Sequence, residues 1–175
     1  GAGRGASSLT YVTVGTGIGG GTIINGRLVH GAGHPELGHI YPRRLPGDQD
    51  FAGFCPFHGD CLEGLACGPA IIARWGSSLS DLPSDHEAHD LVAGYLAHMC
   101  HSIYASMATE IIVLGGGVMK TPGLLDKVVK RAEELGAGYF PSRENHKIVS
   151  PALGDNAGLT GTLLLAEAAL RAEQS

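Results

Sequence analysis

Residues 11–31, YVTVGTGIGGGTIINGRLVHG, decide the fold of this chain. The β-branched and aromatic residues of segment 9–14 predict a buried strand that ends at the first glycines. Asn25 and Gly26 lie between two apolar runs, and this pair is the strongest short signal for a β-hairpin. The sequence therefore predicts a strand, a glycine-rich turn and then a hairpin.

The glycines of this stretch match the dinucleotide-binding pattern GxGxxG by letter, at Gly15, Gly17 and Gly20. A dinucleotide site also needs a helix directly after the glycines, because the helix N-terminus receives the pyrophosphate. A hairpin follows here instead, which argues against a dinucleotide. The backbone N–H groups of the turn and the Thr16 hydroxyl can still hold an anion without a helix.

A second glycine turn follows the apolar start of segment 110–119, EIIVLGGGVM, which reads as a strand. Segment 121–135 then predicts a helix, with Thr121 as N-cap, Pro122 in the first turn and Gly136 as the stop. Two such turns in one chain predict a nucleotide between them, since glycines let a flat adenine or ribose approach the backbone. The alternative, that each turn only reverses the chain, stays open.

The other segments complete an α/β pattern. Segments 68–75 and 84–109 predict helices, 146–153 predicts a short strand, and 158–173 predicts an amphipathic helix. The resulting order of strands and helices is typical of an α/β architecture. With 175 residues, 43% of them hydrophobic and 17% charged, the chain can fold around a sizeable core.

Charge and hydrophobic pattern argue against two classes of partner, nucleic acids and membranes. A formal net charge of −5 argues against broad nucleic-acid binding, which needs clustered Lys and Arg. No run of about 18 apolar residues is present to span a membrane. The amino-terminal residues GAGRGASS lack the basic-then-apolar order of a signal peptide. We therefore expect a cytoplasmic protein with neither nucleic acid nor a membrane as partner.

Two cysteines and a histidine have the spacing of metal ligands in the segment Cys55-Pro-Phe-His58-Gly-Asp-Cys61. Together with His39 they predict a closed tetrahedral Cys2His2 zinc site, in which two thiolates balance the dication. The surrounding loop has little hydrophobic content, and a structural metal would order it. Two alternatives stay open: a disulfide or free thiols at the two cysteines, and His34 in place of His39 as fourth ligand.

Two carboxylates lie close to the predicted metal ligands in the sequence. Glu36 and His39 are three residues apart in HPELGH, so both can point the same way from one turn. Glu63 follows the ligand Cys61 by two residues. Carboxylates accept hydrogen bonds from vicinal hydroxyls, and a metal-bound histidine can donate from its other ring nitrogen. A polyhydroxyl ligand is therefore predicted; the alternative is that both carboxylates are ordinary caps or surface charges.

Taken together, five motifs resemble the ROK family of sugar kinases. They are VTVGTGIGGG, HGAGHPELGH, GFCPFHGDCLEGLACGPAI, IVLGGGVM and LGDNAGLTGTLLLA. The Cys-x2-His-x2-Cys segment after HPELGH resembles the bacterial, zinc-containing fructokinase branch. The resemblance covers nearly the whole chain. It implies an actin-like ATPase (ribonuclease H-like) fold, with residues 1–175 forming the carboxy-terminal lobe of a two-lobed sugar kinase and residues 34–67 its zinc-binding loop.

The resemblance also implies a function and a set of sites. The activity would be ATP-dependent phosphorylation of a hexose, most simply fructose to fructose 6-phosphate, with Mg²⁺ accompanying ATP and a homodimer as the assembly. Phosphates would contact Thr16 and Gly17, and the adenosine would face Gly115, Gly116 and Gly117. Sugar hydroxyls would be bound by Glu36, His39 and Glu63, and zinc by His39, Cys55, His58 and Cys61.

One part of the family pattern is not found in this sequence. ROK kinases carry an amino-terminal lobe with a first phosphate loop and an Asn-Asp pair whose Asp is the catalytic base. The sequence begins just after the expected place of that Asp, so no catalytic residue is assigned, and we expect the chain alone to be nearly inactive. Two further hypotheses stay open: a non-catalytic sugar-sensing or regulatory module, and a zinc-stabilised structural domain.

Overall fold

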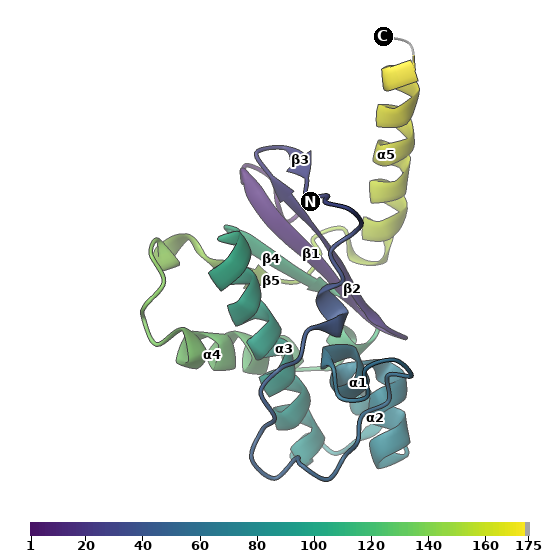
Figure 1. The fold of residues 1–175 in the computed structure, drawn as a ribbon, viewed down its shortest axis with the longest axis vertical. Helices are drawn as coiled ribbons and strands as arrows, with labels where there is room; N and C mark the ends of the chain where they lie inside the picture. Colours follow the sequence, from purple (N-terminus) through teal and green to yellow (C-terminus); the bar gives the residue numbers. More distant parts are fainter. Residues whose placement is uncertain (174–175) are drawn as a thin grey trace.

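The computed structural model describes residues 1–173, which fold around one five-stranded sheet. The strand order is β3-β2-β1-β4-β5 (Figure 1), with β1 antiparallel to β2 and parallel to β4. The predicted α/β class is therefore confirmed. The strands are β1 (Ser8–Val14), β2 (Ile18–Ile24), β3 (Arg27–Leu28), β4 (Ile111–Gly115) and β5 (Lys147–Val149).

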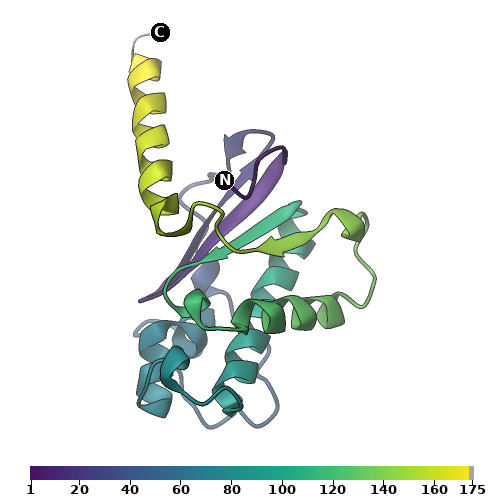
Figure 2. The ribbon, with the colours of Figure 1, turned by 180° about the vertical axis from the view of Figure 1, so that it is seen from behind.

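Helices α1 to α4 pack together into one group. Helices α3 and α4 pack against each other, and α1 packs on both α2 and α3. Figure 2 shows this group from behind, with α5 rising on its own. The core consists mainly of apolar side chains from α1 to α4 and from β1 and β4. The helices are α1 (Leu62–Ala66), α2 (Gly68–Trp75), α3 (Glu87–Met107), α4 (Leu124–Gly136) and α5 (Ala157–Glu173).

The central strands β1 and β4 explain the position of both glycine turns. Side chains of β1 alternate between buried and more accessible positions, whereas all five residues of β4 are buried. The two strands run parallel, with Thr13 opposite Gly115. Their carboxyl ends therefore lie at the same edge of the sheet, where ligands bind in many α/β proteins.

The predicted hairpin is confirmed, but its first strand begins earlier than predicted and includes three of the glycines. Asn25 and Gly26 form its turn with φ values of 51° and 74°, as a tight hairpin requires. Gly19, Gly20 and Gly21 are not part of the first glycine turn, because they pair with β1 as residues of β2. Only residues 15–17 connect the two strands.

The predicted start of helix α4 is wrong by two residues. Thr121 and Pro122 lie in a turn rather than in the helix, and the N-cap is Gly123 with a φ of 74°. The 3-10 turn Val118–Lys120 precedes them, and the N–H of Leu124 donates to the oxygen of Thr121. The prediction failed because Thr-Pro-Gly suits a tight turn as well as a helix start.

Helix α5 differs from the predicted amphipathic helix. It projects from the rest of the molecule (Figures 1 and 2), and its leucines are exposed on more than one side. The exposed fractions of Leu159, Leu163, Leu164, Leu165 and Leu170 lie between 59% and 63%. The helix thus carries apolar surface that the described part of this chain does not cover.

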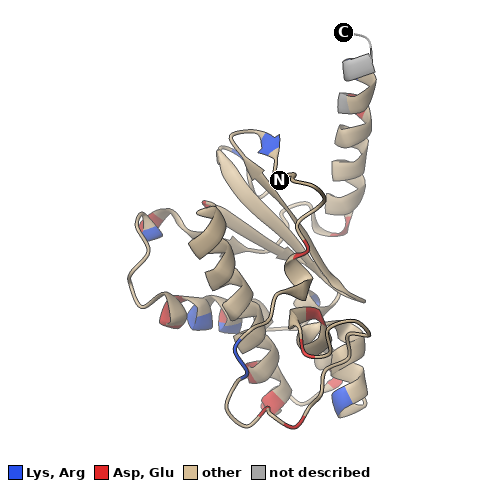
Figure 3. Cartoon of the chain, in the orientation of Figure 1, with Lys and Arg blue, Asp and Glu red and all other residues tan. Residues whose placement is uncertain are grey.

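Charged residues are unevenly distributed over the elements. Figure 3 shows few charged residues on the strands, whereas α4 carries both acidic and basic residues. Within residues 1–173, no helix is both long enough and apolar enough to cross a bilayer.

Candidate metal and ligand site

The first glycine turn is held by backbone hydrogen bonds. The N–H of Gly15 donates to the oxygen of Gly17 at 2.9 Å, which closes the turn. The N–H of Gly68, the first residue of α2, donates to the oxygen of Gly15 at 2.7 Å. The Thr16 side chain is exposed at the tip. The structure therefore presents the Thr16 hydroxyl on a fixed turn, here called the phosphate turn (residues 15–17) after the ligand that the sequence predicts for it.

The second glycine turn lies against the first. A Cβ placed on Gly15 would lie 4.0 Å from the backbone nitrogen of Gly117. Gly116 has a φ of +96°, and a Cβ there would lie 2.3 Å from the oxygen of Val14. Gly117 and Thr16 line one cavity of about 330 Å³, bounded on its other sides by residues of α2 and of the 3-10 turn Leu79–Asp81.

The three glycines of the second turn have different surroundings. Gly115 is buried, and a Cβ there would lie 2.5 Å from the Tyr11 hydroxyl and 2.9 Å from Pro151. Gly116 provides the close approach to β1, whereas a Cβ on Gly117 would meet no atom within 4 Å. Of the predicted adenosine-facing residues, Gly117 is thus the one that borders the cavity beside Thr16.

The four predicted zinc ligands come together in one cluster. Their ligand atoms all lie within 4.8 Å of one another, although His39 is 16 residues from the nearest cysteine. The Nδ1 atoms of His39 and His58 are 3.3 Å apart, and Cys61 Sγ lies 3.5 Å from the His39 Nδ1. Cys55 Sγ lies 3.7 Å from the Nδ1 of His58 and 3.9 Å from that of His39.

These four separations are close to the edges of a zinc tetrahedron. With Zn–N near 2.05 Å and Zn–S near 2.3 Å, tetrahedral edges are about 3.3 Å between nitrogens and about 3.6 Å between nitrogen and sulfur. The donor set of two thiols and two imidazoles is also typical of structural zinc. The residues therefore fit the metal in both chemistry and spacing.

The alternative of a disulfide is not found, because Cys55 and Cys61 are both free thiols. Burial raises the pKa of Cys61, which favours the neutral thiol until a cation is bound. Burial also opposes ionisation of Cys55, but the backbone N–H groups of Phe57 and His58 lower its pKa. His34, the alternative fourth ligand, instead lies against the His30 ring with centroids 5.2 Å apart.

Glycines shape the backbone that carries the cysteines. Cys55 and Gly59 exchange backbone hydrogen bonds of 3.2 and 2.9 Å, which form a tight knuckle, and Gly59 has a φ of +61°. A Cβ on Gly64 of helix α1 would lie 1.9 Å from the oxygen of Gly59. The knuckle can pack directly on α1 because Gly64 lacks a side chain, whereas Gly59 supplies the left-handed backbone conformation of the knuckle.

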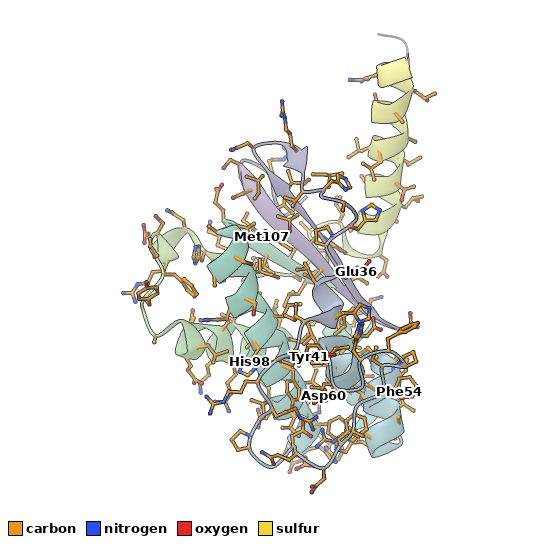
Figure 4. All side chains as sticks on the ribbon, viewed as in Figure 1. Glu36, Tyr41, Phe54, Asp60, His98 and Met107 are labelled. Carbon is orange, nitrogen blue, oxygen red and sulfur yellow. The ribbon has the colours of Figure 1, made fainter. Side chains whose placement is uncertain are left out.

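The predicted sugar-binding carboxylates belong to two different elements: Glu63 lies in α1, and Glu36 is the residue before the 3-10 turn Leu37–His39. Glu63, half-buried in α1, accepts a hydrogen bond from the N–H of Ile18 at 2.9 Å. It borders an open cavity of about 500 Å³ with the phosphate turn and the glycines of β2. Glu36 is exposed and directly precedes the 3-10 turn Leu37–His39. Figure 4 labels it close to β2.

The structure also contains a buried ionic cluster that the sequence analysis did not predict. The Asp48 carboxylate is fully buried. It accepts a hydrogen bond from the Tyr95 hydroxyl and forms an ion pair with Arg74. Arg44 lies 3.8 Å from Asp48 and pairs with Asp60 at 3.0 Å. The cluster ties the loop before the knuckle to α2 and α3. The i,i+4 spacing of Arg44 and Asp48 was the only local signal, since the other partners are distant in sequence.

Comparison with known proteins gives a consistent result. The model of the ROK family matches residues 1–169. The chain is 48% identical over 172 residues to a fructokinase of Zymomonas mobilis and 44% identical over 175 residues to a putative fructokinase of Bacillus subtilis. Both alignments include 97% of this chain, but only 57% of the first relative and 58% of the second.

A solved structure supports the fold assignment. The ROK hexokinase from Thermus thermophilus superimposes with a TM-score of 0.76 at 28% identity, over 94% of this chain and 58% of that protein. The predicted actin-like ATPase class is therefore confirmed. As with the sequence relatives, the chain spans little more than half the length of the protein that it matches.

Proposed function

The chain belongs to the ROK family, and from this we propose that it is the carboxy-terminal lobe of an ATP-dependent sugar kinase of the zinc-containing fructokinase type. The similarity to two fructokinases supports fructose as the hexose, with fructose 6-phosphate as product. The chain's length relative to these proteins supports the assignment to one lobe.

We propose that ATP, as its Mg²⁺ complex, binds at the convergence of the two glycine turns. The phosphates would contact Thr16 and Gly17; Thr16 lines two neighbouring cavities and Gly17 lines one of them. The adenosine would lie against Gly117, whose missing side chain leaves the cavity open, while Gly115 and Gly116 keep β4 close to β1. Donors fixed before the ligand arrives lower the cost of holding the phosphates.

The hexose would bind beside the metal cluster. In our proposal, sugar hydroxyls donate hydrogen bonds to the carboxylates of Glu36 and Glu63 and accept one from His39. The Nδ1 atom of His39 would bind the metal, which leaves its other ring nitrogen for the sugar. The bound zinc supplies structural order, because its four protein ligands leave no position for a reacting group. Sugar recognition therefore depends on the knuckle indirectly, through the position of His39.

The chemical step needs a base near the attacking hydroxyl, and we assign none to the described residues of this chain. We propose that an Asp of an amino-terminal lobe supplies it and that this lobe covers the exposed leucines of α5. The exposed fractions near 60% along this helix support that arrangement, because such apolar surface usually lies at an interface. A homodimer, common in this family, is compatible with the same surface.

The observation that carries the proposal is the convergence of the two glycine turns beside the Cys2His2 cluster. Its test is a coupled assay of fructose phosphorylation with ATP and Mg²⁺. The chain alone is expected to be nearly silent, whereas a longer protein that contains it together with the amino-terminal lobe is expected to turn over. Fast turnover by the chain alone would refute the claim that this chain lacks the catalytic base. Sugar binding without turnover by the longer protein would favour a sugar-sensing module over a kinase.

A further inference from the structure

Glu63 connects the metal-ligand segment with the phosphate turn. Helix α1 begins directly after the ligand Cys61, which is its N-cap, and Glu63 lies in its first turn. The Oε2 atom of Glu63 accepts a hydrogen bond from the N–H of Ile18 at 2.9 Å. Ile18 is the first residue of β2 after Gly17. One side chain thus spans the distance between the two sites.

The contact between Glu63 and the turn is close. A Cβ on Gly17 would lie 2.7 Å from the same Oε2 atom, so the carboxylate packs on the backbone of the turn itself. Hydrogen bonds from an N–H group to a carboxylate are stronger than those between neutral groups. The position of the phosphate turn therefore depends on where α1 holds Glu63.

The position of α1 depends in turn on the segments that carry the metal ligands. A helix of five residues is not stable by itself. Its first residue, Leu62, donates to the oxygen of Ile40, which follows His39, at 2.9 Å. Its Gly64 oxygen accepts from the N–H of Phe54, which precedes Cys55, at 2.9 Å. Drawing the four ligands together around a cation fixes both of these neighbours and so fixes α1.

We infer that Glu63, in addition to its proposed contact with the sugar, is a positioning residue that couples metal binding at His39, Cys55, His58 and Cys61 to the geometry of the phosphate turn. Metal occupancy and the affinity of the turn for a triphosphate are then linked, although no metal ligand contacts the phosphates. The coupling goes beyond the proposed kinase function, and its second test rests on the nucleotide site of that proposal.

The first test is hydrogen exchange of the Ile18 amide, followed by NMR in the zinc-loaded chain. Glu63→Ala is expected to speed exchange of this amide roughly five- to tenfold, because one hydrogen bond is lost. Glu63→Gln keeps an acceptor oxygen and is expected to stay near the wild-type rate. Glu133→Ala removes an exposed carboxylate of α4 and serves as control. Wild-type exchange in Glu63→Ala would overturn the proposal.

Removal of zinc by a chelator is expected to speed Ile18 exchange in the wild type but to add little in Glu63→Ala. The amide of Ile112, in the buried strand β4, reports whether the chain as a whole stays folded. Unchanged Ile18 exchange after complete metal loss would refute the coupling.

The second test uses the reciprocity of linked binding equilibria and needs no separately prepared metal-free protein. Zinc affinity is measured by competition with a chelator, with and without ATP. ATP is expected to tighten zinc binding in the wild type and in Glu133→Ala, and to have no effect in Glu63→Ala. An equal effect of ATP in Glu63→Ala would contradict the coupling. Absence of any ATP binding would count against the proposed nucleotide site, while the exchange experiment would still decide the role of Glu63.

Discussion

Thr13 of β1 lies directly opposite Gly115 of β4 in a parallel pair, so the two glycine turns leave the sheet side by side. Neither turn alone defines a ligand site, because short glycine motifs are common where strands end. Their convergence places Gly15 against Gly117 and leaves Thr16 at the edge of a shared cavity. The account of nucleotide binding depends on this arrangement.

Alanine substitutions in the second turn separate packing from ligand binding. Gly116→Ala is expected to lower the free energy of unfolding by roughly 2 to 4 kcal/mol, because φ is +96° and a Cβ would collide with Val14. Gly117 has helical backbone angles, and a Cβ there would meet no atom within 4 Å. Gly117→Ala should therefore change the free energy of unfolding by no more than about 1 kcal/mol. Urea unfolding measures both.

Gly117→Ala is nevertheless expected to weaken ATP binding by roughly tenfold, since its methyl group enters the cavity. Calorimetric titration of this variant gives the comparison with wild type. Equal ATP affinity would show that the nucleotide does not lie against Gly117.

Thr16→Val tests the hydroxyl of the phosphate turn. Removing a hydrogen bond to a charged phosphate is expected to weaken ATP binding roughly ten- to hundredfold, with zinc content unchanged. Thr162→Val, on the exposed face of α5, is the matched control and should bind ATP as the wild type does. Unchanged affinity in Thr16→Val would count against this assignment.

Substitution of the knuckle cysteines tests the metal site. Native mass spectrometry should show one zinc per chain, lost in Cys55→Ser and in Cys61→Ser, since each removes a thiolate ligand. Cys67→Ser alters another buried thiol, outside the cluster, and should keep its zinc. A folded wild-type chain without metal would refute the zinc proposal.

The buried phenol Tyr95 predicts a pH dependence of stability at alkaline pH. Burial, together with the hydrogen bond to Asp48, raises its pKa to about 12 from the ordinary 10. The folded state thus holds this proton more tightly than the unfolded state. The corresponding stability is present below pH 10 and is lost as pH rises towards 12, amounting to roughly 2 to 3 kcal/mol.

Tyr95→Phe is therefore expected to be less stable at neutral pH and to lose less stability between pH 10 and pH 12. Tyr139→Phe, at a position that is 84% exposed, should keep the wild-type pH dependence. Urea unfolding at several pH values measures these slopes. Parallel slopes for Tyr95→Phe and wild type would contradict the role assigned to the Asp48 contact.

Local patterns predicted most of the fold and the clustering of the Cys and His side chains. The Asn25-Gly26 hairpin and helix α2 follow the sequence closely, because turn chemistry and apolar spacing act over a few residues. The ligands Cys55, His58 and Cys61 were predictable for the same reason, since short spacing brings them onto one knuckle. His39 joins them as predicted, although its place depended on tertiary packing.

Contacts between distant segments could not be predicted from sequence patterns. The burial of Asp48 among Arg44, Arg74 and Tyr95 depends on how the loop meets α2 and α3. The bond from Ile18 to Glu63 joins residues 45 apart, and no periodicity signals it. The exposure of the α5 leucines was also missed, because their spacing does not reveal what covers them.

The most direct test of the central claim is an NMR titration of the zinc-loaded chain with a non-hydrolysable ATP analogue and Mg²⁺. The account predicts that the largest amide shift changes occur at Thr16, Gly17 and Gly117, on both sides of the shared cavity. It would be contradicted by saturable binding whose shift changes lie elsewhere, or by no binding at millimolar analogue.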